Sequence, residues 1–433
     1  MSAFLIFSDD WGRHPSSCQH LTRSLMLEGG HRVYWVNTIG TRPPGWNLLT
    51  LRRGFGKIRS WFGNRGKMES RTQGASGSKE DVSRKEPVPK ILHPVMYPWF
   101  RHGFDRRLNR FLMSRAINHV LAEAGETDVT AITTLPITAD LPGELPAVKR
   151  WVYYCVDDWS RWPGMDARPL AEMEAELIRK MDWIVTAGEN LHDRIQALGR
   201  DSLLLTHGID LDFWRGTQSG EVRKNPEFTR KLTRPVFTFW GLIDERLEPE
   251  MVERLAQDAP HGTILLAGPV AAPEVAKRLE AIPNARLLGM VPYEKLPQLA
   301  AESDVLIMPY RKNDATEQIQ PLKMTEYLAS GRPAVVRALR ASEPWSDALD
   351  EADSPETFSR LARFRALSGL PAAQVSARKR LESETWDEKA RQFEAYIMQE
   401  TPETPENPEI PEKPETPEIP EAGLPQNEFS SEK

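Results

Sequence analysis

The chain has 433 residues, long enough for two domains, and its formal net charge is −6 at pH 7. Its two cysteines, Cys18 and Cys155, lack the spacing of a metal site and indicate a reducing compartment. The first residues lack the basic region of a signal peptide, and no window approaches the roughly 20 apolar residues that span a bilayer. We therefore expect a cytoplasmic protein, soluble or peripheral at the inner face of a membrane.

The first part of the chain predicts a doubly wound α/β domain over residues 1–206, in which helices alternate with the strands of a parallel sheet. The buried run AFLIFS at 3–8 is a strand, and a helix from Cys18 to Glu28 and a second strand follow it. The GxGxxG fingerprint of a dinucleotide site is absent. Further helices and strands are expected at 106–124, 129–133, 150–158, 169–181, 182–188, 189–199 and 202–210.

A basic insertion over about residues 51–90 interrupts this domain. Its first part, 51–67, carries six basic and no acidic residues, with aromatic and aliphatic side chains between them. One interpretation is a segment that lies on an anionic membrane surface. The other is a basic loop with a few packed aromatic rings, because its glycines weaken any helix.

A hinge over 207–234 leads to a second domain at 235–375, where strands and helices alternate strictly. Such alternation indicates a second parallel sheet. Gly241 and Gly268 end two of its strands, and glycine allows the backbone to approach a phosphate closely.

The end of the chain is strongly acidic. Residues 400–433 hold ten glutamates and two lysines, so −8 of the net charge lies there and about +2 on the rest. Pro-Glu-x repeats seven times between Pro402 and Ala422, which predicts an extended, disordered tail. The tail either keeps the protein in solution or binds a basic partner, and the weakly basic remainder fits an anionic ligand.

The most informative stretch is QIQPLKMTEYLASGRPAVV at 318–336. It has the form of a loop, an amphipathic helix, a turn and a buried strand. Pro321 opens the helix and Gly331 closes it. Three apolar residues have helical spacing and are expected to face a core: Leu322, Tyr327 and Leu328.

Polar groups in the same stretch suit a phosphorylated sugar. Glu326 is not expected in the core, and its carboxylate could accept hydrogen bonds from sugar or ribose hydroxyls. The loop before Pro321 leaves the N–H groups at the start of the helix available, and these suit a phosphate.

This stretch resembles the nucleotide-sugar site of retaining glycosyltransferases with the GT-B fold, specifically family four. Its form is similar to a bacterial branch that builds cell-surface polysaccharides. In that family two glutamates flank seven residues; Glu326 matches the second, and Gln318 stands at the first position. The resemblance extends nearly element by element over 236–336. It implies two Rossmann-like parallel-sheet domains that face a cleft, with a terminal helix in 376–399 that crosses back to the first domain.

The resemblance also implies roles for single residues. Glu326 would accept hydrogen bonds from the ribose, and Asp157 stands where relatives often have a histidine that contacts the donor sugar; these two form the predicted catalytic set. Lys323 and Arg246 are candidate cations for the diphosphate, although Arg246 could equally be a surface residue. The other candidate substrate-binding residues are Ser16, Ser17, Gly241, Gly289, Val291, Gln318, Ile319 and Gln320.

Other polar residues at these loops have different expected roles. Asp157 and Asp158 are adjacent, so their side chains point in opposite directions along a strand and do not suit a metal. His207 is expected to shape the hinge, and His14 lies on the first loop, where acceptor and diphosphate would approach.

The implied reaction is metal-independent transfer of a hexose-type sugar, with retention, from a nucleoside diphosphate to a glycan or lipid-linked acceptor. We expect no cofactor beyond the nucleotide-sugar substrate and no nucleic-acid partner. Two alternatives remain: a sugar-nucleotide 2-epimerase, which shares the fold, and a non-catalytic assembly partner, which Gln318 and the sparse cations near Gly241 favour.

Overall fold

The computed structural model describes residues 2–12, 16–37, 87–159, 167–216, 226–317, 319 and 321–399. The predictions for the basic segment 51–67 and for the acidic tail at 400–433 lie outside these ranges. So do His14, Gln318 and Gln320. They stay predictions from the sequence.

Seven parallel strands form the sheet of the first domain within the described ranges, in the order β3-β2-β1-β4-β5-β6-β7. These strands are β1 (Ala3–Ser8), β2 (Arg32–Asn37), β3 (Lys90–Leu92), β4 (Val129–Thr133), β5 (Val148–Cys155), β6 (Trp183–Thr186) and β7 (Leu203–Leu204). Because β1 pairs with β2 on one side and β4 on the other, the strand order reverses beside it. In an open parallel sheet, ligands bind at the carboxyl ends of the strands near such a reversal.

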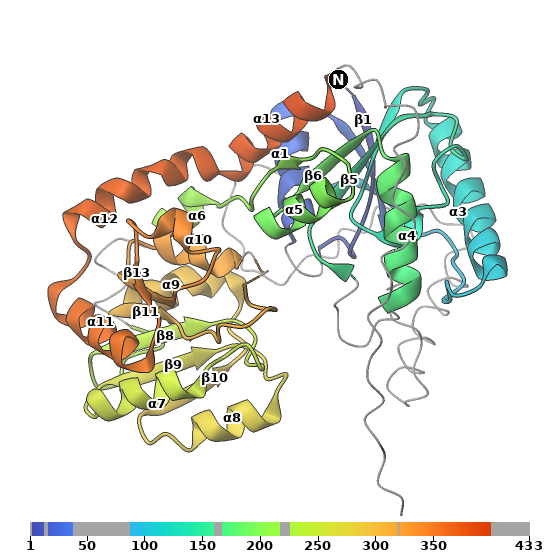
Figure 1. Ribbon diagram of the computed structural model, residues 1–433. Coiled ribbons are helices and arrows are strands. Elements are labelled where there is room, and N and C mark those ends of the chain that lie inside the picture. The colour runs from blue at the N-terminus through green and yellow to red at the C-terminus, as the bar shows by residue number, and fades with distance from the viewer. Residues whose placement is uncertain are drawn as a thin grey trace, which may run out of the picture.

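Helices cover both faces of this sheet. On one face, α3 (Gly103–Glu123), α4 (Ala167–Lys180) and α5 (Glu189–Ala197) bury their apolar sides in a shared core. On the other face, α1 (Ser17–Gly29) packs beside α13 (Trp386–Ile397). Figure 1 shows α13 in red beside α1, far from the second domain that precedes it in the chain.

The second domain has a parallel sheet of six strands in the part of the chain that the structure describes, in the order β10-β9-β8-β11-β12-β13. The strands are β8 (Val236–Trp240), β9 (Thr263–Ala267), β10 (Ala285–Gly289), β11 (Val305–Met308), β12 (Ala334–Arg337) and β13 (Asp350–Ala352). The helices before, between and after these strands are α6 (Leu211–Arg215), α7 (Pro249–Asp258), α8 (Pro273–Glu280), α9 (Leu296–Glu302), α10 (Leu322–Ala329), α11 (Pro355–Ser368) and α12 (Ala372–Ala377).

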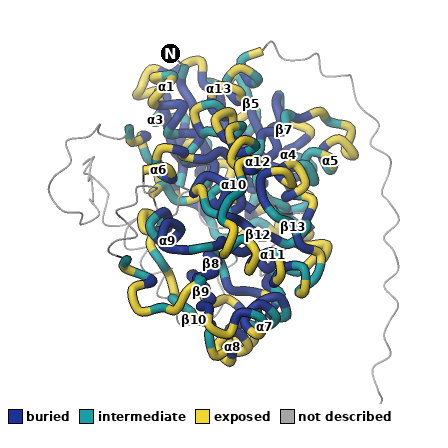
Figure 2. The backbone as a smooth tube through the Cα atoms, turned by 90° about the vertical axis from the view of Figure 1, so that its left-hand side faces the viewer, coloured by how far each residue is buried: buried dark blue, intermediate teal, exposed yellow. Residues whose placement is uncertain are grey.

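The helices of the second domain form two groups around the sheet. The group of α7, α8 and α11 is in mutual contact through α7, and the group of α6, α9 and α10 is in contact through α6. Figure 2 shows the strands as largely buried and the exposed residues on the outer turns of helices such as α8. The predicted fold class, two Rossmann-like parallel-sheet domains, is therefore confirmed.

Some local predictions differ from the structure. Strand β5 ends at Cys155 and not at residue 158, and β13 is a strand that was not predicted from the sequence. Leu322 was expected in the core but is 37% exposed, whereas Met324 is buried. Helix α10 begins at Leu322 after Pro321, so residue 322 lies on the first turn of the helix, before its buried residues.

The crossing segment ties the two domains together at the hinge. The Ile209 N–H donates to the Glu384 carbonyl at 2.8 Å, and Ile209 also pairs with Thr385 as a short bridge. Phe393 and Ile397 of α13 are fully buried in the first domain's core. No helix of the described residues is both long and apolar enough to cross a bilayer.

Candidate functional site

Two glycines bring the ends of β8 and β9 into unusually close contact. Gly241 follows β8 with φ +140°, and Gly268 follows β9 with φ +145°. A Cβ placed on Gly268 would lie 2.7 Å from the Gly241 carbonyl carbon and would overlap its oxygen. Larger residues are therefore excluded at the carboxyl edge of this sheet, and no side chain of residue 241, which is half-buried, stands between its backbone and an approaching phosphate.

Glu326 lies beside this edge and is held by an aromatic residue. The Trp240 Nε1–H donates to Glu326 Oε2 at 2.9 Å. Burial raises the pKa of Glu326, although hydrogen bonding from Trp240, the charge of Lys323 and hydrogen bonding from Tyr293 all act to lower it. The carboxylate is thus fixed in position on α10 and kept in a site of low polarity, where a hydroxyl donor would stabilise its charge.

Lys323, one turn earlier on α10, points at the same glycines. Its Nζ donates to the Tyr310 hydroxyl at 2.5 Å and lies 4.9 Å from the ring centre of Phe239 and 5.0 Å from that of Tyr310. A Cβ on Gly241 would overlap this Nζ. Among the described residues no carboxylate lies within 4.0 Å of it, so the cation rests on aromatic faces. Such a cation can take an anionic ligand.

Arg246, the other candidate cation, is already engaged. Its guanidinium pairs with Asp244 at 2.8 Å and lies over the Tyr310 ring at 5.8 Å. A diphosphate would have to compete with Asp244 for this charge, so Lys323 is the better placed of the two.

Gly289 and Val291, two of the predicted substrate-binding residues, lie at and just beyond the end of the neighbouring strand β10. Gly289 has φ +69° and its carbonyl accepts from the Gly268 N–H at 2.7 Å. Val291 packs partly against the domain core, and the ring of Tyr293 stacks on Phe213 at 5.0 Å. The segment that follows β10 therefore borders Glu326 through Tyr293.

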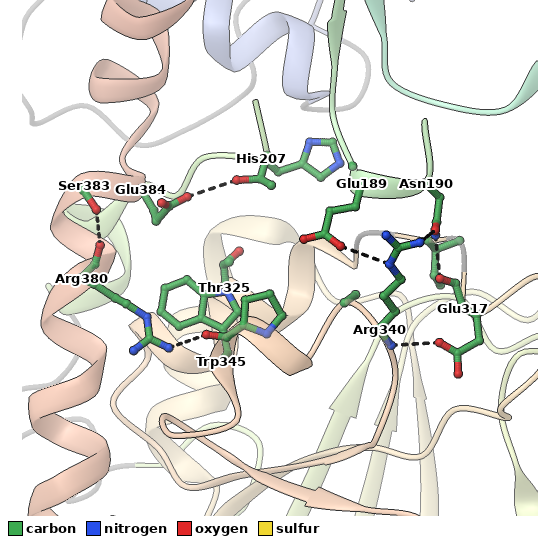
Figure 3. A pocket seen from close by; sticks show the side chains of 15 residues that line it. Glu189, Asn190, His207, Glu317, Thr325, Arg340, Trp345, Arg380, Ser383 and Glu384 are labelled. Atoms are coloured by element: carbon green, nitrogen blue, oxygen red, sulfur yellow. Dashed lines mark hydrogen bonds and ion pairs between the residues drawn. The ribbon is translucent and has the colours of Figure 1, made fainter. Parts of the chain in front are cut away.

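A cavity of about 270 Å³ lies between the two domains near the hinge. Ile319 of the 318–336 stretch and Glu317 just before that stretch line it from the second domain, and Thr325 lines it from α10. Glu189, Asn190 and His207 line it from the first domain and hinge, as Figure 3 shows. Glu317 and Ile319 therefore border a space shared by both domains.

Arg340 connects the two domains across this cavity, and we call its hydrogen bonds to the first domain the latch. Its guanidinium donates to Glu189 at 3.1 Å and to Asn190 at 2.5 Å, as Figure 3 shows, and also to Asp193 at 2.9 Å. All three acceptors lie on α5 of the first domain. Its own N–H donates to Glu317 Oε2 at 2.9 Å, and Asn190 donates to the Glu317 carbonyl at 2.7 Å. The contact between the domains and the position of Glu317 therefore both depend on Arg340.

Replacing Arg340 by alanine should favour the open arrangement of the domains. The side chain is 41% exposed, so we expect a modest change of about 1 kcal/mol, or about fivefold in the ratio of open to closed molecules. The measurement is the radius of gyration from small-angle X-ray scattering, which should increase. Arg380→Ala is the control, because Arg380 lines the same cavity but pairs with Asp347 of its own domain. Equal scattering from both variants would contradict the latch.

On the first domain, Asp157 lies just beyond β5, at the carboxyl edge of the sheet. Burial, and then the charge of Asp158, raises the pKa of Asp157 to about 6. The neighbouring Asp158 lies 3.9 Å from the Arg194 guanidinium. A carboxyl group that titrates near neutral pH can hold a proton or accept one from a hydroxyl group.

Asp157→Asn should stabilise the protein at neutral pH. The folded-state pKa is above the unfolded value of 3.8, so ionisation penalises folding: the penalty is absent below about pH 4 and complete above about pH 6. The variant should gain roughly 1–3 kcal/mol in free energy of unfolding at pH 8 and almost nothing at pH 4. Denaturant titrations at both pH values measure this, with the exposed Asp128→Asn as control. A gain that is the same at both values would contradict the assignment.

The two serines of the first loop take part in internal contacts. Ser16 is the N-cap of α1, where its hydroxyl accepts from the Gln19 N–H and donates to Asp9 at 2.8 Å. Ser17 hydrogen bonds His207 Nδ1 at 2.6 Å. Burial, with the charge of Lys389, lowers the pKa of His207 to about 4, so His207 is a neutral hinge residue that joins α1 to the crossing segment.

The structure brings Gly241, Lys323 and Glu326 together, and places Asp157 on the other domain. The sequence reasoning missed the aromatic residues that hold them, Trp240 and Tyr310 among them. A signal existed for Trp240, which ends β8 directly before the predicted site residue Gly241, but not for Tyr310, which follows a strand without one. The latch residue Arg340 had no local signal, since its partners lie about 150 positions earlier.

Comparisons with known proteins find similarity to glycosyltransferases in part of the sequence. Residues 245–359 match the sequence family described as Glycosyl transferases group 1. A Bacillus subtilis (strain 168) protein named as a teichuronic acid biosynthesis glycosyltransferase, TuaH, is 25% identical over 225 residues, 48% of this chain and 56% of that relative. The match thus spans little more than half of the relative's length.

Solved structures show the fold. Sucrose-phosphate synthase from Thermosynechococcus elongatus superposes with a TM-score of 0.61 at 13% identity, covering 92% of this chain and 98% of the other. HepE from Anabaena, solved in complex with UDP, gives a TM-score of 0.59 at 10% identity, covering 92% and 99%. This chain therefore shares a GT-B-like architecture with both proteins.

Proposed function

We propose that this protein is a retaining, metal-independent glycosyltransferase of family four that uses a nucleoside-diphosphate sugar. Its acceptor would be a glycan or a lipid-linked glycan in surface polysaccharide synthesis. The observation that carries the proposal is the cluster at the carboxyl edge of the second sheet. There, glycine-lined backbone, the cation of Lys323 and the fixed carboxylate of Glu326 lie together.

Each part of the cluster has a task in sugar transfer. Lys323 and the N-terminal end of α10 would neutralise the charge that develops on the departing diphosphate. Glu326 would accept hydrogen bonds from the ribose hydroxyls. The Gly289–Val291 segment would flank the base.

The chemical step exchanges one bond for another at the anomeric carbon. The acceptor oxygen bonds to that carbon as the bond to the diphosphate oxygen breaks, and the acceptor proton passes to the departing phosphate. Asp157 would orient a sugar or acceptor hydroxyl from the first domain. Closure of the domains across the cavity near Ile319 would exclude water.

The proposed acceptor indicates where in the cell the enzyme would act. A lipid-linked acceptor is held at a membrane, so the enzyme would act in the cytoplasm, attached peripherally to the inner membrane face. The basic segment 51–67 is one candidate for that attachment.

The proposal is tested by incubating the protein with labelled UDP-, GDP- and ADP-sugars. We expect hydrolysis or transfer with one of them, and an anomeric configuration in the product that equals that of the donor, as read by NMR. Inversion would contradict the retaining mechanism. A product changed only at C2 would identify an epimerase, and failure to consume or bind any of the three would support a non-catalytic partner.

A further inference from the structure

The outward face of α3 has an unusual composition. Phe104 and Phe111 are 66% and 59% exposed, although the residues around them are ordered in a long helix. At 100° per residue they lie opposite Met113 and Ile117, which are buried in the domain core. Two aromatic rings therefore occupy the middle of the solvent face, where polar side chains are expected.

Arginines alternate with these rings along the same face. Arg107 and Arg115 are exposed at positions three and eleven residues after Phe104. Among the described residues no carboxylate lies within 4.0 Å of either guanidinium, whereas Arg106, on the inward side, pairs with Asp140 and Glu176. The acidic residue of the first turn, Asp105, is buried and accepts from the His102 N–H at 3.0 Å. The face is thus basic and aromatic.

The loop before the helix extends this surface. Trp99 is 39% exposed, and its ring packs at 4.9 Å from that of Tyr97. Asn109 of α3 donates to the carbonyls of both residues, at 3.2 and 3.0 Å, so the loop is fixed against the helix. We call Trp99, Phe104, Arg107, Phe111 and Arg115 the α3 face.

We propose that the α3 face docks on an anionic lipid bilayer. Arginine guanidinium groups would pair with lipid phosphates, while the aromatic rings would enter the interface between headgroups and acyl chains. The face lies on a convex helix, so its shape suits a planar surface. Its charge is complementary to an anionic one.

The position of the helix is compatible with catalysis at the crevice. Figure 1 places α3 at the edge of the first domain that is farthest from the second domain. Docking there would leave the interdomain cavity accessible. The proposal rests on residues separate from 51–67 and does not depend on the proposed sugar transfer.

The test is co-sedimentation of the full chain with phosphatidylcholine vesicles that contain or lack phosphatidylglycerol. We expect binding only where phosphatidylglycerol is present. The double variant Phe104→Ala with Phe111→Ala, and the double variant Arg107→Gln with Arg115→Gln, should each weaken that binding about tenfold or more. Added salt should abolish the difference that the arginines make.

Matched controls lie on α11 of the second domain. Phe364 is 55% exposed, and Arg360 is exposed on the same helix. Phe364→Ala and Arg360→Gln should leave vesicle binding unchanged, and circular dichroism should show that all variants are folded. Absence of binding to the anionic vesicles would overturn the proposal, as would equal losses in the α11 controls. So would α3 variants that convert a dimer to a monomer in sedimentation without changing vesicle binding, because the face would then join two copies.

Discussion

Glu326→Gln is expected to weaken binding of the nucleoside diphosphate about 10- to 100-fold. A hydrogen bond to a charged acceptor contributes roughly 1.5–3 kcal/mol, and the amide keeps the shape but loses the charge. The Trp240 N–H can still donate to the amide oxygen, so the local structure should survive. The measurement is calorimetric titration with the diphosphate that binds the wild-type protein.

The same substitution should increase stability. Burial raises the pKa of Glu326, so its ionised form is disfavoured in the folded state, and the neutral amide removes that cost above the folded pKa. A variant that is more stable but binds less nucleotide would have the signature of a residue kept for function. The control is Glu280→Gln on the exposed end of α8. Unchanged affinity in Glu326→Gln would refute the role of this carboxylate.

Gly268→Ala should be the most destabilising single-methyl change in the second domain. A Cβ at residue 268 would overlap the Gly241 carbonyl oxygen. Both glycines lie at the ends of buried strands and the contact is with backbone, so neither can move far to relieve the overlap. With φ at +145°, strain adds to the overlap. We expect a loss of about 3 kcal/mol or more in free energy of unfolding, with loss of diphosphate binding.

Gly369→Ala supplies the comparison for that variant. Gly369 also has a positive φ, +71°, but a Cβ there would meet nothing within 4 Å. Strain alone should cost about 1–2 kcal/mol. Denaturant titrations of the two variants separate the close approach from the backbone conformation, and equal losses would show that the contact between the strand ends is unimportant.

The fold could be read from the sequence because its signals are local. Buried strands such as β1 and β8 are apolar runs bounded by turns, and the alternation of strands and helices implies parallel sheets. Short edge strands such as β13 were missed, since three residues, two of them acidic, give no periodic signal. Pro321 and Gly331 marked the ends of α10 because proline and glycine act through backbone geometry alone.

The candidate site could be predicted only in part. Lys323 and Glu326 are one turn apart on a helix, so the motif placed them together. The Trp240 indole that holds Glu326 and the Tyr310 ring beneath Lys323 come from other strands, and their contacts depend on how the sheet is stacked. The Arg340 latch depends on the relation of two domains, which no local pattern specifies.

The central claim is that the carboxyl edge of the second sheet holds a nucleoside diphosphate through Lys323. Calorimetric titration of the full chain with UDP, GDP and ADP tests it most directly, with Lys323→Gln measured in parallel. We expect that one of the three nucleotides binds and that Lys323→Gln loses about tenfold or more in affinity for it. Binding of none of the three nucleotides, or equal affinity in Lys323→Gln, would contradict a diphosphate site at Lys323.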